Sequence, residues 1–139
     1  MFKNPIYDLA WSANIINIIK LYTKARQNQD ENNNPILAPI LDYMNANLQF
    51  HITTEELSAL VHMQPNYFIR RFKAACGLPP IAYLGHLRIY KAMELLVSTT
   101  ESIEQIARTV GFTDTSYFSR FFRKNCGVTP SEYRNAFRR

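Results

Sequence analysis

The chain has 139 residues, of which 47% are apolar, and its formal net charge is +5. This composition is too apolar for a disordered protein and suffices for one ordinary core or two small ones. No apolar run approaches the roughly 20 residues of a transmembrane helix, and the first residues lack the pattern of a signal peptide, so we expect no membrane partner.

Residues 1–34 are predicted to form an N-terminal helix followed by a linker. Isoleucines recur at helical spacing between about Asp8 and Arg26, which favours an amphipathic helix. The acidic and asparagine-rich run before Pro35 consists of residues that compete with the helical backbone. We therefore place a domain boundary there, and a second domain spans residues 35–139.

The second domain begins with a predicted helix that ends near Asn47, followed by a first helix-turn-helix unit over about residues 52–77. The core side of the first helix is expected to hold Ile40, Leu41, Met44 and Leu48. Thr53-x-x-Glu56 has the form of a capping box, and Pro65 suits the first position of the next helix. His62 stands in the turn between them, where a left-handed residue, usually glycine, is expected.

A connecting helix is predicted over about residues 80–97, and a second unit follows over about residues 102–126. Ser102-x-x-Gln105 is again a capping box, and Gly111 suits the left-handed turn. Thr129-Pro130-Ser131-Glu132 opens a final helix in the same way.

The two units repeat one pattern. Tyr67-Phe68-x-Arg70-x-Phe72 leads to Cys76-Gly77-x-x-Pro80, and Tyr117-Phe118-x-Arg120-x-Phe122 leads to Cys126-Gly127-x-x-Pro130. Solenoids need at least about three stacked copies, so a single duplication is poorly explained by a solenoid. A helix-turn-helix unit places its second helix in a DNA major groove, so the duplication points to nucleic acid.

Positive charge recurs on the second helix of each unit. Residues 64–77 and 115–127 carry arginines and lysines without an acid, whereas acids gather in the preceding helices at Glu55, Glu56, Glu101 and Glu104. The net charge alone is weak support for a polyanionic partner, but this segregation favours one.

Three consecutive segments carry a family resemblance. They are Ile103-x-x-Ile106-Ala107-x-x-Val110-Gly111-Phe112, then Ser116-Tyr117-Phe118-Ser119-Arg120-x-Phe122, then Gly127-x-Thr129-Pro130-x-x-Tyr133-Arg134. Together they resemble the signature of the AraC/XylS family of bacterial transcription regulators. The resemblance covers roughly residues 36–137, and in the first unit Ser58, His62 and Ile69 depart from the family pattern.

The resemblance implies two helix-turn-helix subdomains. Together with the helices predicted above, it gives an all-α fold with a long connecting helix and an extra N-terminal helix. It implies a cytoplasmic regulator of transcription that binds double-stranded DNA, most often an activator that contacts RNA polymerase. Family members join this domain to a sensing and dimerising domain. Residues 1–34 are therefore interpreted as the remnant of such a domain, which could support a homodimer through the N-terminal helix.

The predicted DNA-binding residues share the outward face of each unit's second helix, because positions i, i+3, i+4 and i+7 lie together. Arginine can bond a guanine edge, asparagine can pair with adenine, and serine suits either. By resemblance, the base-contacting positions are Asn66, Ile69, Arg70, Thr115, Ser116, Ser119 and Arg120. Lys73, Arg123 and Lys124 lie further along and suit phosphates.

Several alternatives remain open at this point. Arg70 and Arg120 could pair with acids such as Glu55 or Glu104 and simply hold each unit together. The whole chain could be a protein-interaction module, with DNA binding weak or lost. An enzyme using Cys76 or Cys126 as nucleophile lacks an activating base.

The sequence predicts no metal, cofactor or catalytic site. It contains no Cys-x-x-Cys pair, no histidine at ligand spacing, no glycine-rich phosphate loop and no catalytic triad. The two cysteines occupy equivalent places in the two copies, so we expect them to be buried small side chains.

Overall fold

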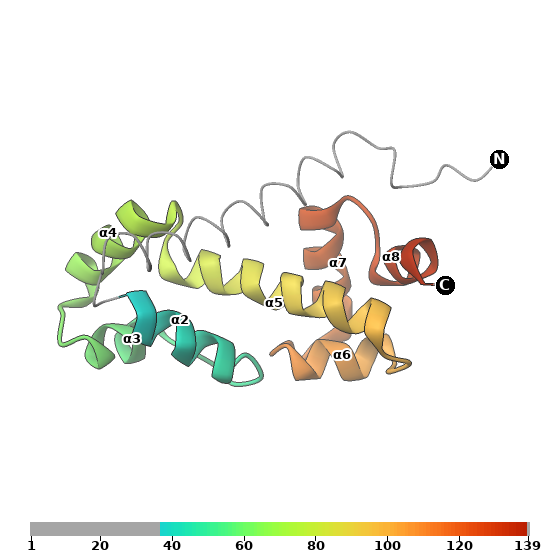
Figure 1. Ribbon diagram of the computed structural model, residues 1–139, viewed down its shortest axis with the longest axis horizontal. Coiled ribbons are helices and arrows are strands. Elements are labelled where there is room, and N and C mark those ends of the chain that lie inside the picture. The colour runs from blue at the N-terminus through green and yellow to red at the C-terminus, as the bar shows by residue number, and fades with distance from the viewer. Residues whose placement is uncertain (1–36, 139) are drawn as a thin grey trace. The chain divides into compact units, whose positions relative to one another are not determined.

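The structure is a computed structural model that describes residues 37–138 (Figure 1). These residues form seven helices and no strand. The helices are α2 (Leu37–Ala46), α3 (Thr54–Leu60), α4 (Pro65–Cys76), α5 (Pro80–Ser98), α6 (Ile103–Thr109), α7 (Thr115–Cys126) and α8 (Pro130–Phe137). The all-α prediction is confirmed. The predicted N-terminal helix and linker, residues 1–34, lie outside the described residues.

The described chain divides into two compact units, and the boundary falls inside α5, between Leu87 and Arg88. We call residues 37–87 the N-terminal unit and residues 88–138 the C-terminal unit. The first part of α5 supplies side chains to one core and the second part supplies side chains to the other. The helix predicted as a connector is therefore a structural element of both units.

The N-terminal unit buries side chains from each of its helices. Its core contains Leu37, Ile40, Leu41 and Met44 of α2, Leu57 of α3, Phe68, Phe72 and Cys76 of α4, and Tyr83, Leu84 and Leu87 of α5. The rings of Phe72 and Tyr83 meet edge to face with centroids 5.4 Å apart, an orientation that aromatic quadrupoles favour. The predicted core side of α4 is thereby confirmed.

The C-terminal unit repeats this packing. Phe118 and Phe122 of α7 are fully buried, among residues of α5, α6 and α8. The ring of Phe122 meets Tyr133 of α8 edge to face at 5.7 Å, as Phe72 meets Tyr83 in the other unit. The duplication therefore extends from each helix-turn-helix unit into the helix that follows it, as Pro80 and Pro130 at the ends of the two repeated motifs indicated.

Helix capping differs between the two copies. At α6, the Gln105 N–H donates to Ser102 Oγ (3.1 Å) and the Ser102 N–H donates to Gln105 Oε1 (3.0 Å), so the predicted capping box is complete. At α3, Thr53 Oγ1 accepts from the Glu56 N–H at 3.2 Å. Within residues 37–138, only Ser102 forms the reciprocal box, so the prediction of equal capping in both copies is wrong. The glutamate side chain of the first copy stays in solvent.

The turns that follow α3 and α6 share one backbone geometry. After α6, the Phe112 N–H donates to the Ala107 carbonyl (2.8 Å) and the Gly111 N–H to the Arg108 carbonyl (3.1 Å), with φ of Gly111 at 100°. After α3, the equivalent bonds form around His62, whose φ is 55°. This left-handed conformation costs a residue with a Cβ atom more than it costs glycine.

We expect His62→Gly to raise the free energy of unfolding by about 0.5–1 kcal/mol. The relief of left-handed strain, about 1–2 kcal/mol, exceeds the extra backbone entropy that glycine loses on folding. Urea unfolding followed by circular dichroism measures the change. The matched control is Gly111→Ala, which should lower the unfolding free energy, and a destabilised His62→Gly protein would contradict the strain argument.

Arg134 of α8 caps the end of α5 within the C-terminal unit. Its Nε donates to the Leu96 carbonyl at 3.0 Å, and its Nη2 donates to the Thr99 carbonyl at 3.4 Å. Carbonyls at a helix C-terminus lack intrahelical partners and carry partial negative charge, so a guanidinium is favourable there.

We expect Arg134→Met to lower the free energy of unfolding by about 1–2 kcal/mol, because it removes a charged donor from half-buried carbonyls. Thermal unfolding measures the loss. Arg108→Met serves as the control, since Arg108 forms only an exposed ion pair with Glu104 and its removal should cost less than about 0.5 kcal/mol. Equal effects of the two substitutions would argue against a capping role.

Candidate nucleic-acid interface

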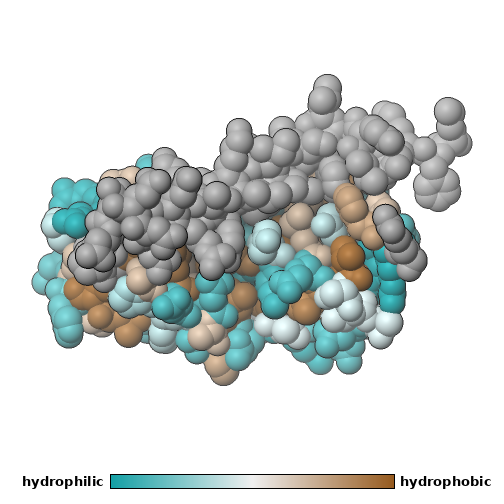
Figure 2. All heavy atoms as spheres, in the orientation of Figure 1, coloured by the Kyte–Doolittle hydropathy of each residue, from teal (hydrophilic) through white to brown (hydrophobic). Residues whose placement is uncertain are grey.

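Helix α4 presents a polar face opposite its buried phenylalanines. Pro65 is its first residue, as predicted, and Gln64 precedes it without a side-chain cap. Of the residues predicted to bind DNA from this helix, Asn66, Arg70 and Lys73 are exposed and Ile69 is half-buried. Figure 2 shows hydrophilic atoms at the upper left edge of the view, where α4 lies in Figure 1, with hydrophobic atoms below them. The helix contains no acidic residue.

Helix α7 presents the corresponding face in the C-terminal unit. The predicted residues Ser116, Arg120, Arg123 and Lys124 are exposed, and Thr115 and Ser119 are half-buried. This helix also lacks an acidic residue. Each unit therefore brings its own predicted residues together on one helix.

Asp114 is a residue of this site that the sequence analysis missed. It is the N-cap of α7, where its Oδ1 accepts from the N–H groups of Ser116 (2.8 Å) and Tyr117 (3.2 Å). An aspartate directly before a helix is a recognised N-cap signal and could have revealed it. The cap fixes the first turn of α7, which carries Thr115 and Ser116.

The proposed structural bridges of Arg70 and Arg120 are not observed. Glu104 instead binds Arg108, four residues further along α6, with Nη2 and Oε1 2.6 Å apart. Neither Arg70 nor Arg120 forms an ion pair with another residue between 37 and 138. Both guanidinium groups are exposed, so they remain available to an external anion.

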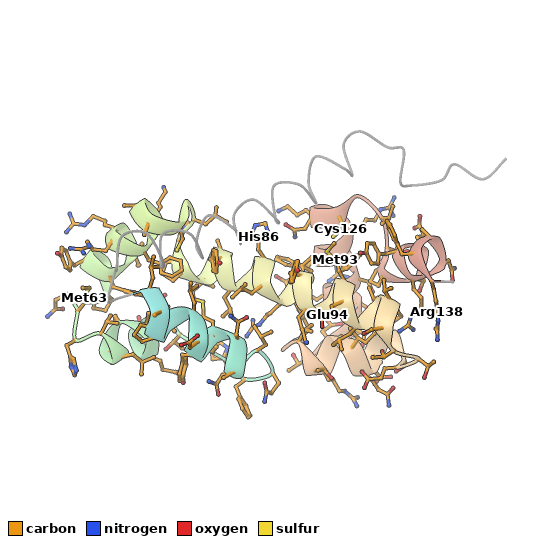
Figure 3. The ribbon with its side chains drawn as sticks, viewed as in Figure 1. Met63, His86, Met93, Glu94, Cys126 and Arg138 are labelled. Atoms are coloured by element: carbon orange, nitrogen blue, oxygen red, sulfur yellow. The ribbon has the colours of Figure 1, made fainter. Side chains whose placement is uncertain are left out.

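Both cysteines are buried, Cys76 in the core of the N-terminal unit and Cys126 in the core of the C-terminal unit. Figure 3 labels Cys126. Burial raises the pKa of Cys126 to about 12 because the charged thiolate would lose its hydration. The thiol is consequently neutral near pH 7 and unsuited to nucleophilic chemistry.

Neither a cluster of metal ligands nor a membrane-spanning helix occurs in the described part of the chain. No group of three histidine, cysteine or acidic residues gathers there in an arrangement that could hold a metal ion. In the same residues, no helix combines the length and the apolar character needed to cross a bilayer.

Comparison with known proteins gives matches over the same part of the chain. A family model described as a helix-turn-helix domain matches residues 57–136. The lactose operon transcription activator of Staphylococcus xylosus is 37% identical over 97 residues, covering 70% of this chain and 35% of that protein. The chain spans only about a third of the length of such curated relatives.

Solved structures agree with the fold. A transcriptional regulator from Chromobacterium violaceum, described as containing an AraC-type DNA-binding domain, is 31% identical with a TM-score of 0.70, covering 75% of this chain and 93% of that one. The DNA-binding domain of the global transcriptional factor AdpA, solved with a target DNA, is 28% identical with a TM-score of 0.69. The match covers 72% of this chain and 90% of the AdpA chain.

Proposed function

This chain belongs to the AraC/XylS family of helix-turn-helix DNA-binding domains, and from that premise we propose that it is a sequence-specific, DNA-binding regulator of transcription. The duplicated face of α4 and α7 carries the proposal. Each helix exposes polar and basic side chains without an acid, and neither Arg70 nor Arg120 is neutralised by a residue between 37 and 138. Such a face suits base edges and phosphates.

In this proposal α4 and α7 are recognition helices that enter successive major grooves, about 34 Å apart along the duplex. Arginine bonds guanine, asparagine pairs with adenine, hydroxyls suit either base, and an apolar side chain contacts a thymine methyl. The base-reading residues are Asn66, Ile69 and Arg70 of α4, and Thr115, Ser116, Ser119 and Arg120 of α7. The phosphate-binding residues are Lys73, Arg123 and Lys124.

The regulatory role is proposed to be activation through contact with RNA polymerase, in the bacterial cytoplasm. The support is the description of one relative as a transcription activator. Residues 1–34, which lie outside the described part of the chain, are proposed to be the end of a sensing or dimerising domain. A homodimer through that segment stays a prediction.

Selection of bound duplexes from random-sequence DNA tests the proposal. We expect one enriched site with two conserved blocks whose centres are about 10 base pairs apart, because each recognition helix reads one groove. Binding to that site should weaken steeply as salt rises, since phosphate contacts release counterions. An unenriched pool, or binding that hardly responds to salt, would overturn the proposal and favour a protein-interaction module.

A further inference from the structure

The two recognition helices carry an exposed tyrosine at the same place in the repeat, but its surroundings differ. Tyr67 of α4 and Tyr117 of α7 are 42% and 51% exposed. In α7, the ring of Tyr117 lies against Phe121 and Phe112, with centroids 6.1 Å and 5.9 Å away. Phe121 in turn packs against the core of the C-terminal unit. Tyr117 is thus held by apolar neighbours.

In α4 an arginine takes the place of that phenylalanine. Arg71 corresponds to Phe121, and its Nη1 donates to the Tyr67 hydroxyl at 3.0 Å. The guanidinium carbon of Arg71 is 5.7 Å from the Tyr67 ring centroid, and that of Arg70 is 6.0 Å away. One tyrosine therefore organises two cations on the surface of the N-terminal unit.

The position of this pair on α4 matters for its function. Each residue of a helix advances about 100° around the axis. Tyr67 directly follows Asn66, and Arg71 directly follows Arg70. Both are therefore turned in the same direction from the base-reading face and lie at one border of it. Side chains at the border of a helix in the major groove are directed at the sugar-phosphate wall, whereas the central ones reach base edges.

Arg71 is exposed and forms no ion pair with any residue from 37 to 138. An unrestrained arginine loses much rotamer freedom when it binds, and that loss opposes binding. The hydroxyl bond and the ring restrict Arg71 before any ligand arrives, while the remaining N–H groups of its guanidinium stay free to donate.

We propose that Arg71, ordered by Tyr67, binds a phosphodiester oxygen of duplex DNA and gives the N-terminal unit a backbone contact that the C-terminal unit lacks at the equivalent position. Tyr67 acts through Arg71 and is a positioning residue. The inference rests on the proposed function, since it adds a contact to the same interface.

Fluorescence anisotropy with a labelled random-sequence duplex of about 30 base pairs, near three helical turns, tests this contact. Arg71→Ala should lower the slope of log affinity against log salt by about one. Raising salt from about 50 to 200 mM should therefore weaken the variant about 3.5-fold less than the unmodified protein. The decrease in salt slope caused by Arg71→Ala should be the same for random and selected duplexes, because phosphates carry no sequence information.

Three further variants separate positioning from charge. Tyr67→Phe keeps both cations, so the salt slope should stay unchanged while affinity falls about threefold through loss of the hydroxyl acceptor. Arg71→Lys should restore the slope lost in Arg71→Ala. Lys91→Ala is the control, since Lys91 is already paired with Glu94 at 3.2 Å, and its slope should stay near that of the unmodified protein.

The outcomes distinguish this inference from the proposed function. If the unmodified protein binds DNA with steep salt dependence and Arg71→Ala keeps the same slope, the phosphate contact is wrong and the proposed function stands. If Arg71→Ala lowered the affinity for the selected site but not for random duplexes, Arg71 would read a base, and the inference would be overturned as well. If the DNA affinity of the unmodified protein did not change with salt concentration, the proposed function would be overturned instead.

Discussion

Phe122→Ala is expected to lower the free energy of unfolding of the C-terminal unit by about 3–5 kcal/mol. Phe122 is fully buried, and its ring lies 5.9 Å from Phe118 and 5.7 Å from Tyr133. Truncation removes apolar area from the core and leaves a cavity bordered by two rings that packing on α5 and α6 prevents from closing. Urea unfolding monitored by circular dichroism and by tyrosine fluorescence measures the loss.

Two other substitutions provide a comparison for the loss of unfolding free energy in Phe122→Ala. Phe72→Ala removes the equivalent ring from the N-terminal unit and should have a similar cost, because Phe72 has an equivalent edge-to-face partner in Tyr83. Phe50→Ala truncates a side chain that is 58% exposed, and it should cost far less. A Phe122→Ala protein within about 1 kcal/mol of the unmodified chain would contradict the packing described for α7.

Removing both exposed arginines of the recognition helices is expected to abolish most sequence discrimination. Arg70→Ala and Arg120→Ala should each cost about 1–3 kcal/mol on the selected site, which is the value of one good arginine contact to a base. Because the two residues belong to units with separate cores, we expect the losses to add to about 2–6 kcal/mol in the double variant. The measurement is the ratio of affinities for the selected and random duplexes.

The control for this experiment is Arg108→Ala, which removes one positive charge that Glu104 already neutralises. It should leave the affinity ratio unchanged. If the double variant also kept the full ratio, the two arginines would not read bases, and their exposed positions would reflect only a solvated face.

The sequence was most informative where structure is decided locally. Pro65 and Pro130 begin their helices as predicted, and α5 ends one residue beyond the predicted Val97. Prolines, cap residues and glycines act through their own backbone and that of the nearest turn, so their effect can be predicted from short segments. Asp114 obeys the same rule, since its side chain caps the helix that begins at the next residue.

Features that depend on distant residues could not be predicted in this way. The bond from Arg134 to the Leu96 carbonyl joins positions 38 residues apart, and nothing in either segment alone specifies it. The incomplete capping box at Thr53 is a local exception, because the motif is present but only the Glu56 N–H to Thr53 Oγ1 bond forms. The different environments of Tyr67 and Tyr117 are by contrast local, since Arg71 and Phe121 lie four residues further along the same helices.

Helix α5 limits how this fold can be recombined. Since residues of one continuous helix complete both cores, a chimera that takes its halves from two relatives must be spliced within helical backbone and not in a loop. One inserted residue at the splice would shift the helical phase by about 100° and the rise by about 1.5 Å. Exchange of binding specificities by domain grafting therefore requires a junction that conserves residue count from Tyr83 to Leu96.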